Sequence, residues 1–136
     1  MISRILNQLF EHSNHFILLR EDRDLPYPAF SIIEKDIYNR YNPVILINQK
    51  IIPQDENILA HVLAHEWGHH VSKHIKHDPP PMNLRPSQAE VQKKEHEADQ
   101  YAAQFVKKYN YDIETIATFM RDHPFDLDNR LAILFN

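Results

Sequence analysis

The 136-residue chain contains no cysteine and a single glycine, and the lack of cysteine narrows the chemistry that it can support. Without cysteine there can be no disulfide framework, no thiolate metal site and no cysteine nucleophile. Any metal ion must therefore be held by histidine and carboxylate side chains, and the chain has ten histidines and nineteen acidic residues.

Long apolar runs are also missing, which bears on where the protein works. No run approaches the roughly 20 residues that a membrane-spanning helix needs. The N-terminal sequence MISRILNQLFEHSNH has no continuous apolar core of signal-peptide length. We therefore expect a cytoplasmic protein with no membrane span.

Charge and length set further bounds. A net charge of −4 and a pI of about 6.2 argue against a nucleic-acid partner. Hydrophobic residues make up 43% of the chain and charged residues 25%, as in an ordinary globular protein. A single domain over residues 1–136 is expected, large enough to fold without a disulfide or a structural metal.

The N-terminal half of the sequence predicts one helix and three strands. Apolar residues at helical spacing between Ile2 and Phe10 indicate an amphipathic helix. Three apolar or β-branched segments indicate strands, at 15–20, 29–33 and 42–48.

The C-terminal half predicts only helices. One should run over 56–76, where the proline-rich segment HDPPPMNLRP ends it. A second, opened by a capping box, should run over 88–109, and shorter helices should follow at 112–120 and 126–135. Because strands come first and helices after, the expected fold class is α+β.

The only glycine and the only tryptophan lie in the stretch AHEWGHH, which contains the pattern His-Glu-x-x-His. On an α-helix, His65 and His69 lie one turn apart on the same face, so their rings can converge on one Zn²⁺. Glu66 projects about 100° away, where it can reach a water on the metal without binding the metal. The pattern predicts a zinc site with two histidine ligands and Glu66 as catalytic base.

Chance is the competing explanation, since short His/Glu patterns arise readily in a chain with ten histidines. Two features favour a real site. The pattern lies within a strongly periodic apolar segment, and Gly68 in mid-helix costs about 1 kcal/mol relative to alanine, so it needs a packing reason. A metzincin site is excluded, because Ser72 and Ile75 stand where that site needs glycine and histidine.

A catalytic zinc site also needs a third protein ligand and an open position. The second long helix offers EHEAD, in which Glu95 and Asp99 share a face and the small Ala98 permits close helix approach. We expect Glu95 to bind the metal, with Glu97 as the next candidate, and Asp99 to accept the free ring N–H of a ligand histidine. The alternative is that 93–97 is a solvated charged face.

The other histidines of this region are placed by their spacing. His61 lies one turn before His65 and is expected to line the same cleft. His70, His74 and His77 are expected at the surface on another face, and no site is assigned to them.

The combination LAHVLAHEWGHH … KKEHEADQYAAQF resembles the gluzincin metallopeptidases, in particular the CAAX prenyl endopeptidases and heat-shock metallopeptidases. The resemblance covers residues 42–134 and implies a zincin-like domain in a small, soluble form without that family's transmembrane helices. A short mixed sheet of about three strands would pack on the helix that carries HExxH, and a second long helix would carry ExxAD. The resemblance gives the two histidines, Glu66, Glu95 and Asp99 the roles that the spacing indicates.

The C-terminal segment DHPFDLDNRLAIL is similar to the His-Pro…Arg segment of that family. In the family, this histidine and arginine lie at the cleft and help to stabilise the reacting centre. The resemblance therefore assigns a catalytic role to His123 and support of the substrate or transition state to Arg130. The gap between them is one residue longer than in the family pattern.

Together these residues predict a zinc-dependent endopeptidase with one Zn²⁺ per chain and a peptide or protein substrate. The strand at 44–48 is expected to be the edge to which an extended peptide pairs. Two alternatives stay open: a zinc-stabilised binding or regulatory module without turnover, and a regulatory peptidase of the anti-repressor type. A base beside the metal disfavours the first, and the second would need a DNA-binding domain or partner.

Overall fold

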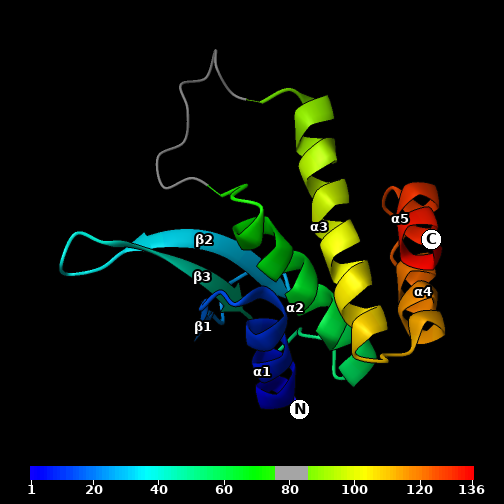
Figure 1. Cartoon of the computed structure of the whole chain (residues 1–136), viewed down its shortest axis with the longest axis horizontal. Helices are drawn as coiled ribbons and strands as arrows, with labels where there is room; N and C mark the ends of the chain where they lie inside the picture. Colours follow the sequence, from blue (N-terminus) through cyan, green and yellow to red (C-terminus); the bar gives the residue numbers. More distant parts are fainter. Residues whose placement is uncertain (76–85) are drawn as a thin grey trace.

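The computed structural model describes residues 1–75 and 86–136, and its class is α+β, as predicted. Within the described residues it has five helices and one three-stranded mixed sheet (Figure 1). In chain order the elements are α1 (Ile2–Ser13), β1 (Leu18–Glu21), β2 (Ala29–Lys35), β3 (Tyr41–Ile47), α2 (Glu56–Val71), α3 (Gln88–Lys108), α4 (Ile113–Asp122) and α5 (Leu127–Phe135). The order of elements matches the prediction, and the boundaries shift. The predicted proline-rich loop and His77 lie outside the described residues.

β3 is the central strand of the sheet. It pairs in parallel with β1 and antiparallel with β2, so the strand order is β1-β3-β2. The prediction that 44–48 forms a free edge is therefore wrong. Residues Val44–Ile47 are all buried, and such a continuous apolar run is typical of a strand that is covered on both faces. β2 is an edge strand, and it contacts α2.

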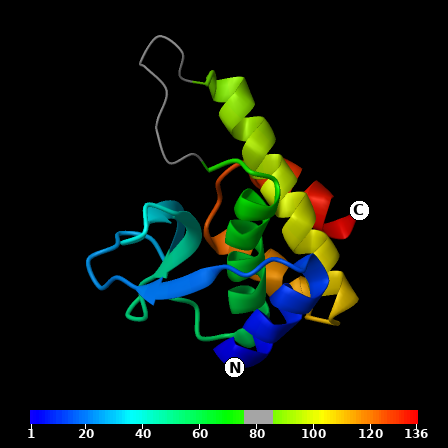
Figure 2. The same cartoon turned by 60° about the vertical axis from the view of Figure 1, so that its left-hand side comes forward.

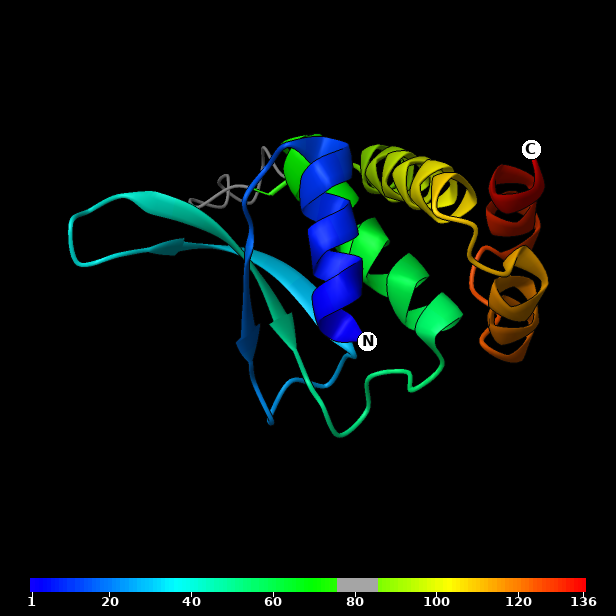
Figure 3. The ribbon, with the colours of Figure 1, turned by 60° about the horizontal axis from the view of Figure 1, so that its bottom comes forward.

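α2 lies in the middle of the fold, with the sheet on one side and α3, α4 and α5 on the other (Figure 2). Leu59, Leu63 and Trp67 of this helix are buried in the core. α1 runs alongside the sheet and α2 (Figure 3), and its Ile5 and Leu9 are completely buried in the same cluster. This central position explains why most positions round α2 are buried.

α2 begins as predicted and ends earlier than predicted. The Asp55 side chain caps the start, accepting hydrogen bonds from the backbone N–H groups of Asn57 (2.8 Å) and Ile58 (3.2 Å). The helix ends at Val71, so the predicted extension toward residue 76 is wrong. The chain turns at Lys73, whose φ of 58° lies in the left-handed region that usually favours glycine.

The C-terminal helices form the far side of the core. Ser87 caps α3 through a hydrogen bond from the N–H of Glu90, and Asp112 caps α4 through one from the N–H of Glu114. Leu134 of α5 is buried with the core, so α5 is an integral layer of the domain. No helix in the described ranges is long and apolar enough to cross a membrane.

Candidate metal centre

Gly68 allows α2 and α3 to approach closely at the site. A Cβ atom at this position would lie 2.9 Å from Cβ and 3.1 Å from Cγ of Tyr101 on α3. Carbon atoms pack best at about 3.5–4.0 Å, so any side chain here would push the two helices apart. Ala98 of α3 is also completely buried. This is the packing reason for a mid-helix glycine, and it brings the α2 histidines within reach of the α3 carboxylates.

His65, His69 and Glu95 form a cluster whose ligand atoms all lie within 4.8 Å of one another, and this cluster could hold a metal ion. The Glu95 Oε2 atom lies 2.8 Å from Nε2 of His65 and 3.4 Å from Nε2 of His69. Ligand atoms on a tetrahedral zinc ion are about 3.3 Å apart when metal–ligand distances are about 2.0–2.1 Å. The two contacts to Glu95 fall on either side of that spacing, so the donor set fits such an ion.

Asp99 binds the ring nitrogen of His65 that does not face Glu95. The Nδ1–H of His65 donates to Oδ1 of Asp99 at 2.8 Å. Arg130 of α5 donates to the same carboxylate, from Nε at 2.8 Å and from Nη2 at 3.2 Å. Burial alone would raise the pKa of Asp99, but these hydrogen bonds outweigh it and hold the pKa at about 2. An ionised Asp99 keeps a proton on Nδ1 of His65 and leaves Nε2 facing Glu95.

The charge on His65 depends on its two carboxylate neighbours. Burial would lower the pKa of His65, but hydrogen bonds to Asp99 and Glu95 outweigh burial and raise the pKa to about 9. The same contacts, from His65 first and His69 second, hold the pKa of Glu95 well below its usual range. In the metal-free protein at neutral pH, His65 is therefore an imidazolium between two carboxylates.

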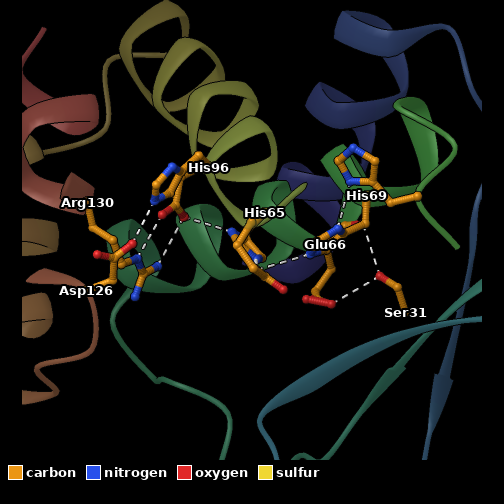
Figure 4. Close-up of polar contacts among 10 residues, drawn as sticks. Ser31, His65, Glu66, His69, His96, Asp126 and Arg130 are labelled. Carbon is orange, nitrogen blue, oxygen red and sulfur yellow. Dashed lines mark hydrogen bonds and ion pairs between the residues drawn. The ribbon is translucent and has the colours of Figure 1, made fainter. Parts of the chain in front are cut away.

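Glu66 lies outside the metal cluster and reaches toward the sheet (Figure 4). The hydroxyl of Ser31 on β2 lies 3.1 Å from Oε1 of Glu66 and 3.0 Å from its backbone oxygen, so its single O–H can donate to either. Burial raises the pKa of Glu66, while the nearby His65 and His69 oppose that rise. Ser31 was not predicted from the sequence, where its only signal is an inward position in the strand segment AFSII.

Two small cavities flank the cluster. The larger, about 180 Å³, lies between β2, α2 and α4, and His61, Glu66 and Arg130 provide its polar lining together with His65. His61 lines the cleft as predicted, and burial lowers its pKa to about 3, so it is neutral. The smaller cavity, about 110 Å³, lies on the α3 and α5 side. Arg130 lines both cavities.

His123 and Arg130 occupy different environments. Arg130 contacts Asp99 within the site. The His123 side chain is exposed, its ring stacks on Phe119 with ring centroids 4.2 Å apart, and its Nδ1 lies 3.0 Å from the Phe119 backbone oxygen. Phe119 lines the larger cavity, so His123 lies next to the cavity wall and is not brought into the cluster.

Two histidines that were predicted to lie at the surface have covered side chains: His70 is buried and His74 is half-buried. Nε2 of His70 lies 3.0 Å from the backbone oxygen of Val44, which connects α2 to the central strand. The His74 side chain is only 7% exposed and contacts His69 and Glu97. The surface prediction is wrong for His70 because its face of α2 packs against β3. It is wrong for His74 because α2 ends at Val71, so His74 is not on the helix face that the spacing implied. Glu97, the alternative third ligand, pairs with His74.

A histidine–aspartate contact that was not predicted from the sequence connects α3 to the start of α5. Nε2 of His96 lies 2.7 Å from Oδ2 of Asp126 (Figure 4). Asp126 has a left-handed φ of 51°, and its side chain accepts hydrogen bonds from His96 and Asn129 in place of capping the helix backbone. This contact fixes the start of α5 and so the position of Arg130 one turn later.

No protein-family model, curated protein or solved structure matches this chain. Any functional inference therefore rests on the site itself: a His/His/Glu cluster that could hold a metal ion, with the half-buried Glu66 beside it.

Proposed function

We propose that the protein is a zinc-dependent endopeptidase with a zincin-like active site. The observation that supports this most strongly is the division of roles between two glutamates. Glu95 contacts both histidine Nε2 atoms, whereas Glu66 is outside the cluster, at a cavity beside it. A site that only stabilises a fold has no use for a half-buried carboxylate that does not bind the metal, but hydrolysis needs a general base in that position.

The donor set favours zinc with an open coordination position. Two imidazole nitrogens and one carboxylate oxygen are the protein ligands typical of catalytic zinc, and they leave room for water or substrate. When bound, zinc supplies a Lewis acid and lowers the pKa of a coordinated water toward about 7.

Glu66 carries the proton transfers in this proposal. Its carboxylate accepts a proton from the attacking water as the water oxygen bonds to the peptide carbonyl carbon. It then delivers that proton to the amide nitrogen as the C–N bond breaks. Burial raises the pKa of Glu66 toward the working pH, which suits a group that must accept and release a proton.

Arg130 is the positively charged group best placed to assist. Two of its guanidinium nitrogens bind Asp99, and its Nη1 has no hydrogen-bond partner among the described residues. Because Arg130 lines the cavities on both sides of the cluster, this nitrogen can donate to the substrate carbonyl oxygen.

The edge strand β2 offers the place for an extended substrate. Its Ser31 touches Glu66, and its Ala29 lines the larger cavity. A peptide that adds to a free strand edge gains backbone hydrogen bonds and presents alternate side chains to pockets. The substrate would therefore run along β2, with one side chain in the 180 Å³ cavity.

Metal removal tests the proposal directly. Purified protein should hydrolyse members of a diverse peptide library, lose that activity on dialysis against a zinc chelator, and regain it with stoichiometric zinc. The readout is the appearance of new peptide termini by mass spectrometry. Zinc uptake without any cleavage would instead identify a non-catalytic zinc module.

The pH dependence of zinc binding should report on His65. Below a pH of about 9, the metal-free site holds a proton on Nε2 that zinc must displace, so the apparent zinc affinity should rise as pH increases from 6 to 8. Near pH 7, about one proton from His65 should be released per zinc, because Glu95 and Asp99 are already ionised. Calorimetry in buffers of different ionisation enthalpy measures this number. A pH-independent affinity with no proton release would contradict the assignment.

A further inference from the structure

His69 is connected to a second pair of side chains that the proposed reaction does not use. Its Nδ1 atom lies 3.0 Å from Nδ1 of His74, and Nε2 of His74 lies 2.9 Å from Oε2 of Glu97. The two rings are 5.2 Å apart between centroids, and the side chains of His69 and His74 are 10% and 7% exposed. The three residues form a continuous chain from the metal cluster to the outer face of α3.

The Glu97 carboxylate at one end of this chain indicates where the protons lie when both imidazole rings are neutral. Glu97 is an acceptor, because an ionised carboxylate has no proton to donate and its Oε2 lies 2.9 Å from Nε2 of His74. It therefore takes the N–H from Nε2 of His74. A neutral imidazole that donates from one nitrogen must accept at the other, so Nδ1 of His74 offers a lone pair. His69 then donates from its own Nδ1, which leaves its Nε2 lone pair for a metal ion shared with Glu95.

We infer that His74, held by Glu97, is a positioning residue that sets the tautomer and orientation of the metal ligand His69; the inference rests on the proposed metal centre. A ligand histidine almost always donates its second ring nitrogen to a fixed acceptor, and removal of that acceptor typically weakens metal binding about 10–100-fold. Asp99 is this acceptor for His65, and His74 is the acceptor for His69.

The turn that ends α2 places His74 for this role. The N–H of Lys73 bonds to the oxygen of His70 (3.0 Å), and the N–H of His74 bonds to the oxygen of His69 (2.9 Å). This is the Schellman arrangement, which folds the chain back over the last helical turn. Its left-handed position is taken by Lys73 with φ 58°, at some cost relative to glycine. The turn therefore folds His74 back onto His69, so that both the backbone and the ring of His74 contact that residue.

His74 is distinct from the metal ligands in the described part of the chain. The cluster whose atoms converge closely enough to share an ion consists of His65, His69 and Glu95. Both ring nitrogens of His74 already face other side chains, His69 on one side and Glu97 on the other. A positioning role and a ligand role make different predictions for zinc stoichiometry.

Three substitutions at one position separate the contributions of the His74 ring. His74→Ala removes both contacts. His74→Asn keeps an acceptor close to the position of Nδ1 and loses the reach to Glu97. His74→Gln keeps a polar group near the position of Nε2, which can bind Glu97, and loses the acceptor toward His69. His15→Ala, at an exposed histidine that hydrogen-bonds to Ser13, is the control.

Zinc affinity is measured on the full chain by competition with a chromophoric chelator, and folding of each metal-free variant is checked by circular dichroism. We expect zinc affinity to fall about 10–100-fold in His74→Ala and His74→Gln, with one zinc still bound at saturation. His74→Asn should stay within a few-fold of the wild type, and His15→Ala should match it. Nitrogen NMR of the His69 ring should show Nδ1 protonated in the wild type and a mixture of tautomers in His74→Ala.

Different failures point to different errors. If the wild type takes up no zinc, the metal centre itself is wrong. If the wild type binds zinc and all three variants bind it equally well, the metal centre stands and the positioning role is overturned. If His74→Ala loses the site altogether while remaining folded, His74 is a ligand. Equal losses in His74→Asn and His74→Gln would overturn the role of Nδ1 as an acceptor.

Discussion

Replacing Glu66 with glutamine should reduce peptide hydrolysis by about 10²–10⁴-fold while zinc binding and folding are retained. The amide has nearly the same shape as the carboxylate and can still accept the hydrogen bond from Ser31, but it cannot take a proton from water. Because Glu66 is outside the His65, His69 and Glu95 cluster, its loss removes no metal ligand. Initial rates on a cleaved peptide, together with zinc content of the same preparation, measure both effects.

A matched control is available on α3. Glu90→Gln removes the same charge from an exposed glutamate near the start of that helix, away from the cluster, and should leave the rate unchanged. Equal hydrolysis by the wild type and the Glu66→Gln variant would rule out the proposed general base. Loss of zinc in Glu66→Gln would show instead that this carboxylate belongs to the metal site.

The parts of the site that follow helical spacing could be predicted from the sequence. His65, Glu66 and His69 lie within one turn of α2, and Glu95 and Asp99 lie one turn apart on α3. Helix geometry alone fixes which of these side chains share a face. The glycine at position 68 also indicated a close approach, because its cost within a helix required a partner, which is Tyr101.

The residues that support these side chains could not be predicted in the same way. Ser31 reaches Glu66 across 35 positions of sequence, and Asp126 reaches His96 across 30. Such contacts depend on how β2, α3 and α5 pack, and the local pattern around each residue carries no sign of them. The position of His74 was mispredicted for a different reason. α2 ends at Val71 and the chain turns at a left-handed Lys73, with neither the glycine nor the proline that usually marks a helix end.

The order of the strands in the sheet could not be predicted from local sequence either. The apolar segments of the N-terminal half identified all three strands, but a strand's place in the sheet depends on which neighbours it pairs with. β3 pairs with a strand on each side and is covered on both faces, which explains its run of four buried residues. β3 is therefore the central strand, and β2 is an edge strand. This correction moves the proposed peptide site to the strand that contacts Glu66.

Replacing Glu95 with alanine should weaken zinc binding by roughly 100-fold or more, because about 10–16 kcal/mol of binding free energy is shared among three or four ligands. Hydrolysis should fall in parallel at limiting zinc, and the metal-free chain should remain folded, since the Glu95 side chain is 44% exposed. Competition with a chelator and circular dichroism measure the two properties.

Glu97→Ala and Glu90→Ala are the matched comparisons on the same helix. Glu90→Ala should leave zinc affinity unchanged, because its side chain is exposed and is not part of the cluster. Glu97→Ala removes only the carboxylate behind His74, so its effect should be smaller than that of Glu95→Ala and should not change the stoichiometry of one zinc per chain. If zinc binding survives Glu95→Ala and is lost in Glu97→Ala, the third ligand is Glu97. In that case α3 would have to present Glu97, in place of Glu95, to the histidines. The contacts that connect His69 to His74 and His74 to Glu97 would then belong to the metal site itself.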